Sequence, residues 1–97
     1  MTHLLLEYAL ADNYLERRPE FRAEHLALLE GPVARGEVVL AGALPDPFDR
    51  ALFIWAEGAE EAAKAFVAAD PYVANGLVTG WQLRTWNTVV GAAMPPA

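Results

Sequence analysis

The sequence predicts one α+β domain in which two strand–helix–strand units follow each other along the chain. Three observations lead to this prediction. The chain has 97 residues, which is the size of one ordinary domain. Hydrophobic residues make up 55% of it and charged residues 21%, a balance that excludes intrinsic disorder. Prolines and glycines divide the chain into segments that alternate between strand-like apolar runs and helix-like spacing.

The first unit opens with a strand close to the N-terminus. Residues 4–10 (LLLEYAL) form a short apolar run, which Asp12-Asn13 ends with two residues that favour turns and helix caps. A helix is predicted over 19–35, after a looser turn at 13–18. Pro19 suits the first turn of that helix, because a nitrogen there needs no intrahelical partner.

The spacing of residues and the C-terminal end of this helix allow two further predictions. A stripe with intervals of four, three and four residues is expected along one side: Arg22, Leu26, Leu29 and Val33. Pro32 is expected to bend or tighten the last turn. Gly36 is suited to cap it, because glycine adopts the left-handed conformation in which many helices end.

A β-hairpin is predicted next. Residues 37–44 contain β-branched valines and residues 50–57 contain a run of large apolar side chains, so both are predicted strands. Between them, Pro45 and Pro47 remove the N–H donors that a β-ladder would need, which predicts a turn over 45–49.

The second helix is predicted over 59–69, where alanine and glutamate predominate. Its apolar side is expected to carry Ala62, Ala65, Phe66 and Ala69. Asp70-Pro71 ends this helix and starts a short turn that runs to Gly76, since aspartate is a good N-cap and proline fits the first helical position. The last strand is predicted over 77–90, and a flexible tail over 91–97.

This order, βαββαβ, is the split βαβ or ferredoxin-like arrangement, a four-stranded antiparallel sheet with two helices on one face. The opposite face also needs a cover, because period-two alternation places Trp81 and Trp86 on different sides of the last strand. A second copy packed face to face would supply that cover. The sequence therefore predicts a single domain over 1–90 that forms a homodimer.

Composition excludes several classes of partner and of chemistry. A net charge of −6 disfavours binding to nucleic acid, and no apolar run approaches the ~20 residues that span a bilayer. Cysteine and serine are absent, the two histidines lack the spacing of metal ligands, and no glycine-rich phosphate loop occurs. We therefore expect a cytoplasmic protein that binds neither nucleic acid nor a membrane and that needs neither a metal nor a cofactor. The chemistry that remains is proton transfer.

A histidine is the natural candidate for such chemistry. His25 and Arg22 are three residues apart, so both lie on one face of the predicted helix, where the imidazole could accept a proton while the guanidinium holds an anion. Alternatively, His25 only packs its ring at the edge of the apolar stripe and forms a hydrogen bond with water or a backbone carbonyl. Asp70 could orient the histidine or accept a proton, or it could simply cap a helix. Tyr8 and Tyr72 carry phenols that could reach a pocket or only pack in the core.

Three features of the sequence resemble the YciI-like family. An arginine precedes a helical His-Leu by three residues within 22–29 (RAEHLALL), and single glycines stand at positions 36 and 42. A late Asp-Pro followed by a short apolar turn occupies 70–76 (DPYVANG). The resemblance covers about residues 3–88, nearly the whole chain.

The resemblance implies a dimeric α+β barrel built from ferredoxin-like protomers. It also implies an active-site dyad of His25 and Asp70, with Arg22 framing the pocket. The chemistry associated with the family includes a lyase that eliminates HCl from a chlorinated hydroxyquinol. The hairpin connection at 45–49 is shorter here than in longer relatives, and such a loop borders a potential pocket in this fold.

Two functions from different classes follow. The first is a cofactor-free lyase or isomerase that acts on a small, aromatic or enolisable molecule, with His25 as base, Asp70 as its partner, and Arg22, Tyr72 and Tyr8 in substrate binding. The second is a non-catalytic, dimeric module that binds a small molecule without turnover. Contact between His25 and Asp70 at a cavity would favour the enzyme.

Overall fold

The computed structural model describes residues 1–94 and confirms the predicted order of the strands and the two main helices. Along the chain it contains β1 (Thr2–Leu10), α1 (Tyr14–Ala34), β2 (Val38–Leu44), β3 (Arg50–Trp55), α2 (Glu60–Ala69), α3 (Pro71–Ala74) and β4 (Val78–Asn87). The short α3 is the turn predicted after Asp70. Residues 95–97 of the predicted tail lie outside the described part of the chain.

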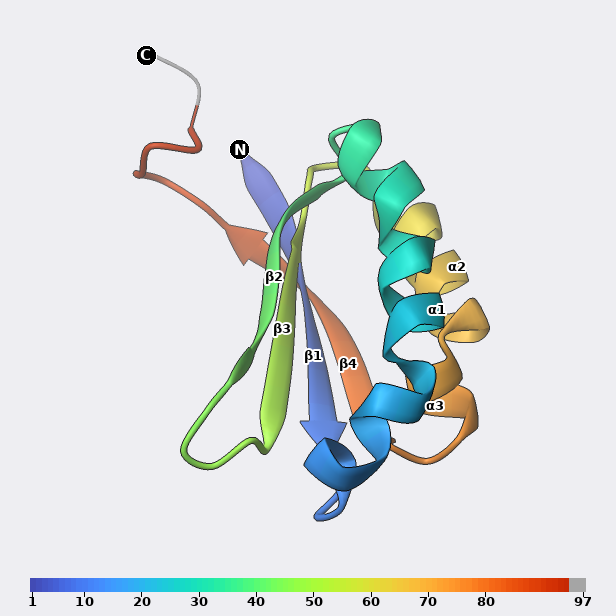
Figure 1. Ribbon diagram of the computed structural model, residues 1–97. Helices are drawn as coiled ribbons and strands as arrows, with labels where there is room; N and C mark the ends of the chain where they lie inside the picture. Colours follow the sequence, from blue (N-terminus) through green and yellow to red (C-terminus); the bar gives the residue numbers. More distant parts are fainter. Residues whose placement is uncertain (95–97) are drawn as a thin grey trace.

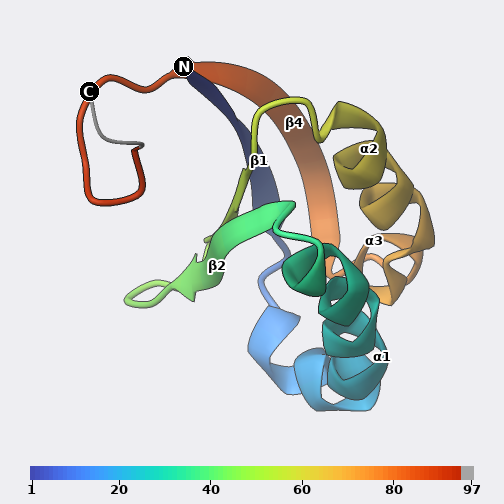
Figure 2. The ribbon, with the colours of Figure 1, turned by 90° about the horizontal axis from the view of Figure 1, so that it is seen from above.

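The four strands form one antiparallel sheet in the order β2-β3-β1-β4. Its central strand β1 pairs with β3 on one side and with β4 on the other. The helices α1, α2 and α3 all cover the same face of this sheet, and the other face carries no helix within residues 1–94 (Figure 1 and Figure 2). The predicted α+β class and its ferredoxin-like topology are therefore confirmed.

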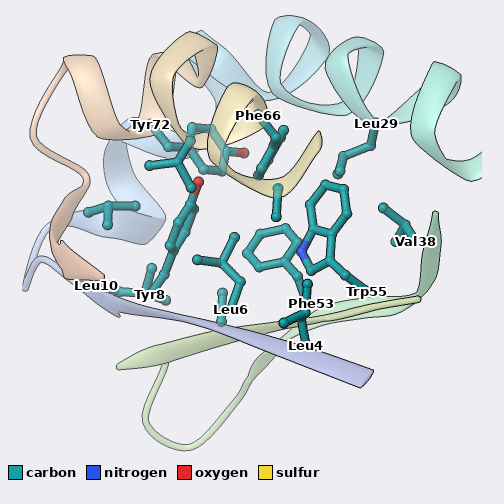
Figure 3. Close-up of a cluster of buried hydrophobic side chains, with 14 of the residues drawn as sticks. Leu4, Leu6, Tyr8, Leu10, Leu29, Val38, Phe53, Trp55, Phe66 and Tyr72 are labelled. Atoms are coloured by element: carbon teal, nitrogen blue, oxygen red, sulfur yellow. The ribbon is translucent and has the colours of Figure 1, made fainter. Parts of the chain in front are cut away.

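The core lies between the sheet and the helices and is rich in aromatic rings (Figure 3). Alternate residues of β1 point into it, and Leu6 and Tyr8 are fully buried. Phe53 and Trp55 of β3 occupy the same face, and the ring centre of Phe66 on α2 lies 5.3 Å from that of Phe53. Burial of each such side chain contributes about 2 kcal/mol, so this cluster holds α2 against the sheet.

Helix α1 begins at Tyr14, five residues earlier than predicted, and continues through Pro19. Tertiary contacts explain the early start. The ring of Tyr14 is buried against that of Tyr72, with centroids 5.8 Å apart, and Arg17 donates a hydrogen bond to the carbonyl oxygen of Asn75 at 2.7 Å. These contacts offset the one helical hydrogen bond that Pro19 cannot donate.

The C-terminal end of α1 confirms the cap predicted at Gly36, whose φ is +75°. The N–H of Gly36 donates to the carbonyl of Val33 at 3.0 Å, and the N–H of Glu37 donates to the carbonyl of Pro32 at 2.8 Å. These two bonds satisfy carbonyl groups that a helix end leaves free.

The side of α1 that faces the core differs from the predicted stripe. Leu26 and Val33 are exposed, whereas Leu29 is buried together with His25. The rotation of the helix is set by the hydrogen bond from His25 to Asp70 and by the core packing of the first turn. Neither contribution appears in the spacing of apolar residues. The prediction was wrong at Val33, whereas Leu26 shares a cavity with Arg22 and Leu29 without being buried.

On α2, Phe66 is buried as predicted, but Ala65 and Ala69 are exposed. Ala63 and Val67 are buried in their place. Alanines occur on nearly every side of this helix, so their spacing cannot determine its orientation. The two larger apolar side chains, Phe66 and Val67, determine it instead.

The outer face of the sheet, away from the helices, presents apolar side chains. Trp81 pairs across the strands with Tyr8 and Trp86 pairs with His3, so the two tryptophans lie on opposite faces, as predicted. On the outer face Leu40 is 67% exposed, and it borders a hollow together with Trp86.

Candidate active site

Asp70 is the most deeply buried polar residue of the described chain, with an exposure of 0%. It stands between α2 and α3 and is the N-cap of α3. Its carboxylate accepts hydrogen bonds from Nδ1 of His25 at 2.8 Å, from Oη of Tyr8 at 2.7 Å and from the backbone N–H of Tyr72 at 3.0 Å. The capping role and the contact with His25, which the sequence left as alternatives, therefore occur together.

His25 reaches Asp70 from the middle of α1. A carboxylate accepts hydrogen bonds and cannot donate them, so Nδ1 carries the proton of this bond and Nε2 holds a lone pair when the imidazole is neutral. The imidazole is stacked on the ring of Tyr72, with centroids 3.8 Å and planes 6° apart. The rings of Phe53 and Phe66 also pack against it, which leaves the imidazole one orientation.

A cavity of about 330 Å³ opens beside His25. Its polar and charged side chains come from α1, β1 and α3: Arg18, Arg22, His25, Tyr8 and Tyr72. The rest of its wall is mainly apolar and includes Leu26, Leu29, Ala41, Ala43, Phe48 and Phe53. A polar edge along α1 thus faces an apolar floor, which suits a small, largely apolar molecule with one polar end.

Sequence reasoning missed several residues of the cavity, among them Arg18 and Phe48. Arg18 lies one turn before Arg22 on α1, a spacing that could have revealed it. Phe48 belongs to the turn between β2 and β3, so the short 45–49 connection does border the cavity. The guanidinium carbon of Arg18 lies 5.8 Å from the centre of the Phe48 ring, a contact between distant segments that no local pattern signals.

Burial changes the acidity of both phenols at the site. The pKa of Tyr8 is raised well above its usual 10.0, first by burial and then by the negative charge of Asp70 and the hydrogen bond to it. Burial also raises the pKa of Tyr72 to about 12; Tyr14 and Asp70 act in the same direction, and the charges of Arg22 and Arg18 act against it. Both phenols are therefore neutral hydrogen-bond donors near pH 7.

The structure brings all five predicted site residues together. His25, Arg22, Tyr72 and Tyr8 line the cavity, and Asp70 stands behind the imidazole. The contact between His25 and Asp70 is the one expected of a dyad. Their catalytic role and the binding roles of the other three stay predictions.

Other kinds of site find little support in the described residues. Within residues 1–94 no group of three or more His, Cys, Asp or Glu side chains could hold a metal ion. His3 lies on the outer face of the sheet, where its Nδ1 is 2.8 Å from Oγ1 of Thr88. In the same part of the chain, no helix combines the length and the apolar character needed to cross a membrane.

Comparison with known protein families gives a match over most of the chain. A family model described as the YCII-related domain matches residues 1–87. The search of curated proteins gave no match.

Several solved structures share the fold at low sequence identity. One is 5-chloro-2-hydroxyhydroquinone dehydrochlorinase from Burkholderia phenoliruptrix AC1100, in complex with 2,5-dihydroxybenzoquinone, with a TM-score of 0.71, 20% identity, and coverage of 88% of this chain and 93% of that one. A second is a NIPSNAP family protein from Agrobacterium tumefaciens, with a TM-score of 0.62, 12% identity and coverage of 97% and 98%. A third is a NIPSNAP-like domain protein from Burkholderia xenovorans, with a TM-score of 0.58, 15% identity and coverage of 98% and 89%. At these identities the likeness shows the fold.

Proposed function

This chain belongs to the family of the YCII-related domain, and on that premise we propose that it is a small-molecule enzyme in which His25 and Asp70 move a proton, as a lyase or an isomerase does. One observation carries the proposal. The buried hydrogen bond between Nδ1 of His25 and Oδ1 of Asp70, 2.8 Å long, lies at the wall of a cavity large enough for a small molecule. A base, its orienting partner and a substrate space therefore occur in one place.

In the proposed reaction Nε2 of His25 is the general base. It takes a proton from an acidic C–H or O–H group of the substrate, and the imidazolium that forms is stabilised by the carboxylate of Asp70. Help of this kind contributes on the order of 10²–10⁴-fold, which suits a proton that is already acidic. An aromatic or enolisable substrate meets that requirement.

The type of reaction depends on where the electron pair goes that remains on the substrate after the proton has left. In an isomerase the pair forms an enolate, and the proton returns from His25 to a different carbon. In a lyase the pair forms a new double bond while a leaving group departs with its own bonding pair. The dehydrochlorinase that shares the fold supports the lyase form, since loss of HCl needs a base for the proton and an exit for chloride.

Asp70 orients His25, and the groups that donate hydrogen bonds to Asp70 hold its carboxylate in place. Oη of Tyr8 and the N–H of Tyr72 hold the carboxylate from two further directions, so it keeps its position when His25 changes its protonation state. A dyad fixed in this way needs no rearrangement during proton transfer.

The test is a panel of small molecules offered to the protein in D₂O. Chlorinated hydroxyquinols are followed by chloride release, and enolisable ketones by deuterium incorporation. We expect at least one class to react, and His25→Ala to remove most of that reaction. His3→Gln is the matched control, because this histidine lies on the outer face of the sheet and should leave the rate unchanged. If panel members bind without reacting, the non-catalytic binding module is the better account.

A further inference from the structure

We propose that the cavity binds a small organic monoanion whose charged oxygens lie between Arg18 and Arg22 and accept a hydrogen bond from Oη of Tyr72. This inference rests on the proposed function for the identity of the pocket, and it names the class of molecule that the pocket takes. It also gives Arg18 a role in selecting the ligand.

The hydroxyl of Tyr72 is the first observation. The side chain is 2% exposed and lines the cavity, yet its Oη has no hydrogen-bond partner among the described residues. A buried hydroxyl left without a partner costs folding free energy, so such a group at a cavity wall points to a ligand atom as its acceptor. As a neutral phenol with a raised pKa, Tyr72 is a donor and can meet an anionic oxygen.

The two arginines are the second observation. Arg18 and Arg22 line the cavity one helical turn apart, and within residues 1–94 neither forms a salt bridge with a carboxylate. Both act electrostatically on Tyr72, because each lowers the pKa that burial raises. The chain has 13 acidic and only 7 basic residues, yet no aspartate or glutamate of the described chain lines this cavity. The local potential is therefore positive on a protein that is negative overall.

Aromatic contacts position Arg18. Its guanidinium carbon lies 5.7 Å from the centre of the Tyr14 ring and 5.8 Å from the centre of the Phe48 ring. Cation–π contact with two rings from different elements holds the guanidinium at the cavity while its N–H donors remain available. An arginine held in this way loses little freedom when it binds an anion.

The charge balance of the site fits one negative charge. Arg18 and Arg22 supply two positive charges and the carboxylate of Asp70 supplies one negative charge, which leaves a net charge of +1 when His25 is neutral. A monoanion neutralises this charge. The apolar part of the wall, with Leu26, Leu29 and Phe53, would hold the body of the ligand, and the cavity of about 330 Å³ limits it to a small molecule.

Calorimetric titration of the full chain tests the inference with two anions and one neutral probe. Benzoate represents carboxylates, 4-nitrophenolate represents phenolates, and benzamide is the neutral counterpart of benzoate. We expect at least one anion to bind about tenfold or more tightly than benzamide. Arg18→Gln and Arg22→Gln should each weaken binding of that anion about ten- to a hundredfold, the usual effect of losing a charged hydrogen bond, and should change benzamide binding by less than about twofold.

Two further variants sharpen the test. Tyr72→Phe removes an oxygen that has no hydrogen-bond partner within residues 1–94, so the fold should be kept while affinity for the anion falls about tenfold. Arg17→Gln is the control, because Arg17 lies on the same helix but contacts Phe21 and Asn75 outside the cavity. The Arg17→Gln variant should bind the anion with the same affinity as the unchanged protein.

The inference is overturned if benzamide binds as tightly as the tighter-binding anion, if neither anion binds, or if Arg18→Gln and Arg22→Gln leave the affinity for that anion unchanged. These outcomes are separate from the fate of the proposed function, because binding requires no turnover. Arginine-dependent anion binding without proton exchange would support the inference and refute the enzyme. Proton exchange on a neutral molecule, at a rate that does not depend on the arginines, would support the enzyme and refute the inference of an anionic ligand.

Discussion

At the scale of single residues, the site depends on which hydrogen bonds the two carboxylate oxygens of Asp70 accept. Oδ1 accepts from Nδ1 of His25 and from the N–H of Tyr72, and Oδ2 accepts from Oη of Tyr8. A fully buried carboxylate is costly unless it is hydrogen-bonded in this way. The same bonds that make the buried charge tolerable also select the tautomer of His25 that leaves Nε2 free for chemistry.

The phenol of Tyr72 predicts a loss of stability in alkali. Its pKa is about 12 in the folded protein and 10.0 in an exposed tyrosine, so above pH 10 the unfolded chain loses this proton before the folded chain does. The contribution to stability is complete below pH 10 and disappears as the pH rises through about 12. Tyr8 acts in the same direction. Urea denaturation on both sides of pH 10 should therefore show a smaller alkaline loss in Tyr72→Phe, and an unchanged loss would contradict the assigned pKa.

At the scale of elements, the strands could be predicted and the orientation of the helices could not. Runs such as residues 4–10 and 50–57, bounded by turn residues, mark their strands by composition alone. Helix α1 was different, because its first turn depends on Tyr14 meeting Tyr72 and its rotation depends on His25 meeting Asp70. These partners are far away in the sequence, so local spacing did not predict that His25 is buried and Val33 exposed.

Gly36 tests the end of α1 on its own. Its φ of +75° strains any residue with a Cβ, although an added Cβ would meet nothing within 4 Å. Gly36→Ala should therefore lower the free energy of unfolding by about 1 kcal/mol through backbone conformation alone. Gly80→Ala in β4 is the control, since that position has equal space and no positive φ, and its stability should not fall by a comparable amount. Equal losses in the two variants in chemical denaturation would argue against the cap.

At the scale of the whole molecule, the site is a product of topology. His25 comes from α1, Tyr8 from the central strand, and Asp70 from the junction of α2 and α3, so only the closed fold brings them together. Residues 45 positions apart show no local signal of contact, and the dyad could be predicted only from the resemblance of two motifs to a family. Arg18 lay outside those motifs and was missed.

The outer sheet face predicts a homodimer. Leu40 is 67% exposed there beside Trp86, and a second copy packed against this face would bury both. We expect sedimentation at micromolar concentration to give twice the monomer mass of 10.6 kDa, with an interface above about 1,000 Å². Leu40→Glu should produce monomers. Val33→Glu, at an exposed site on α1, should not. A monomeric unchanged protein, or a dimer insensitive to Leu40→Glu, would rule out this interface.

The central claim is that His25 and Asp70 act as one unit, and a double-mutant cycle on the reaction found with the panel tests it most directly. The measurement is kcat/KM for His25→Ala, for Asp70→Asn and for the double variant, with the fold of each checked by circular dichroism. Each single change should lower kcat/KM by about 10²–10⁴-fold. The double variant should have a kcat/KM only slightly below that of the less active single variant. Near-normal activity in a folded His25→Ala protein, or losses that multiply in the double variant, would contradict the account.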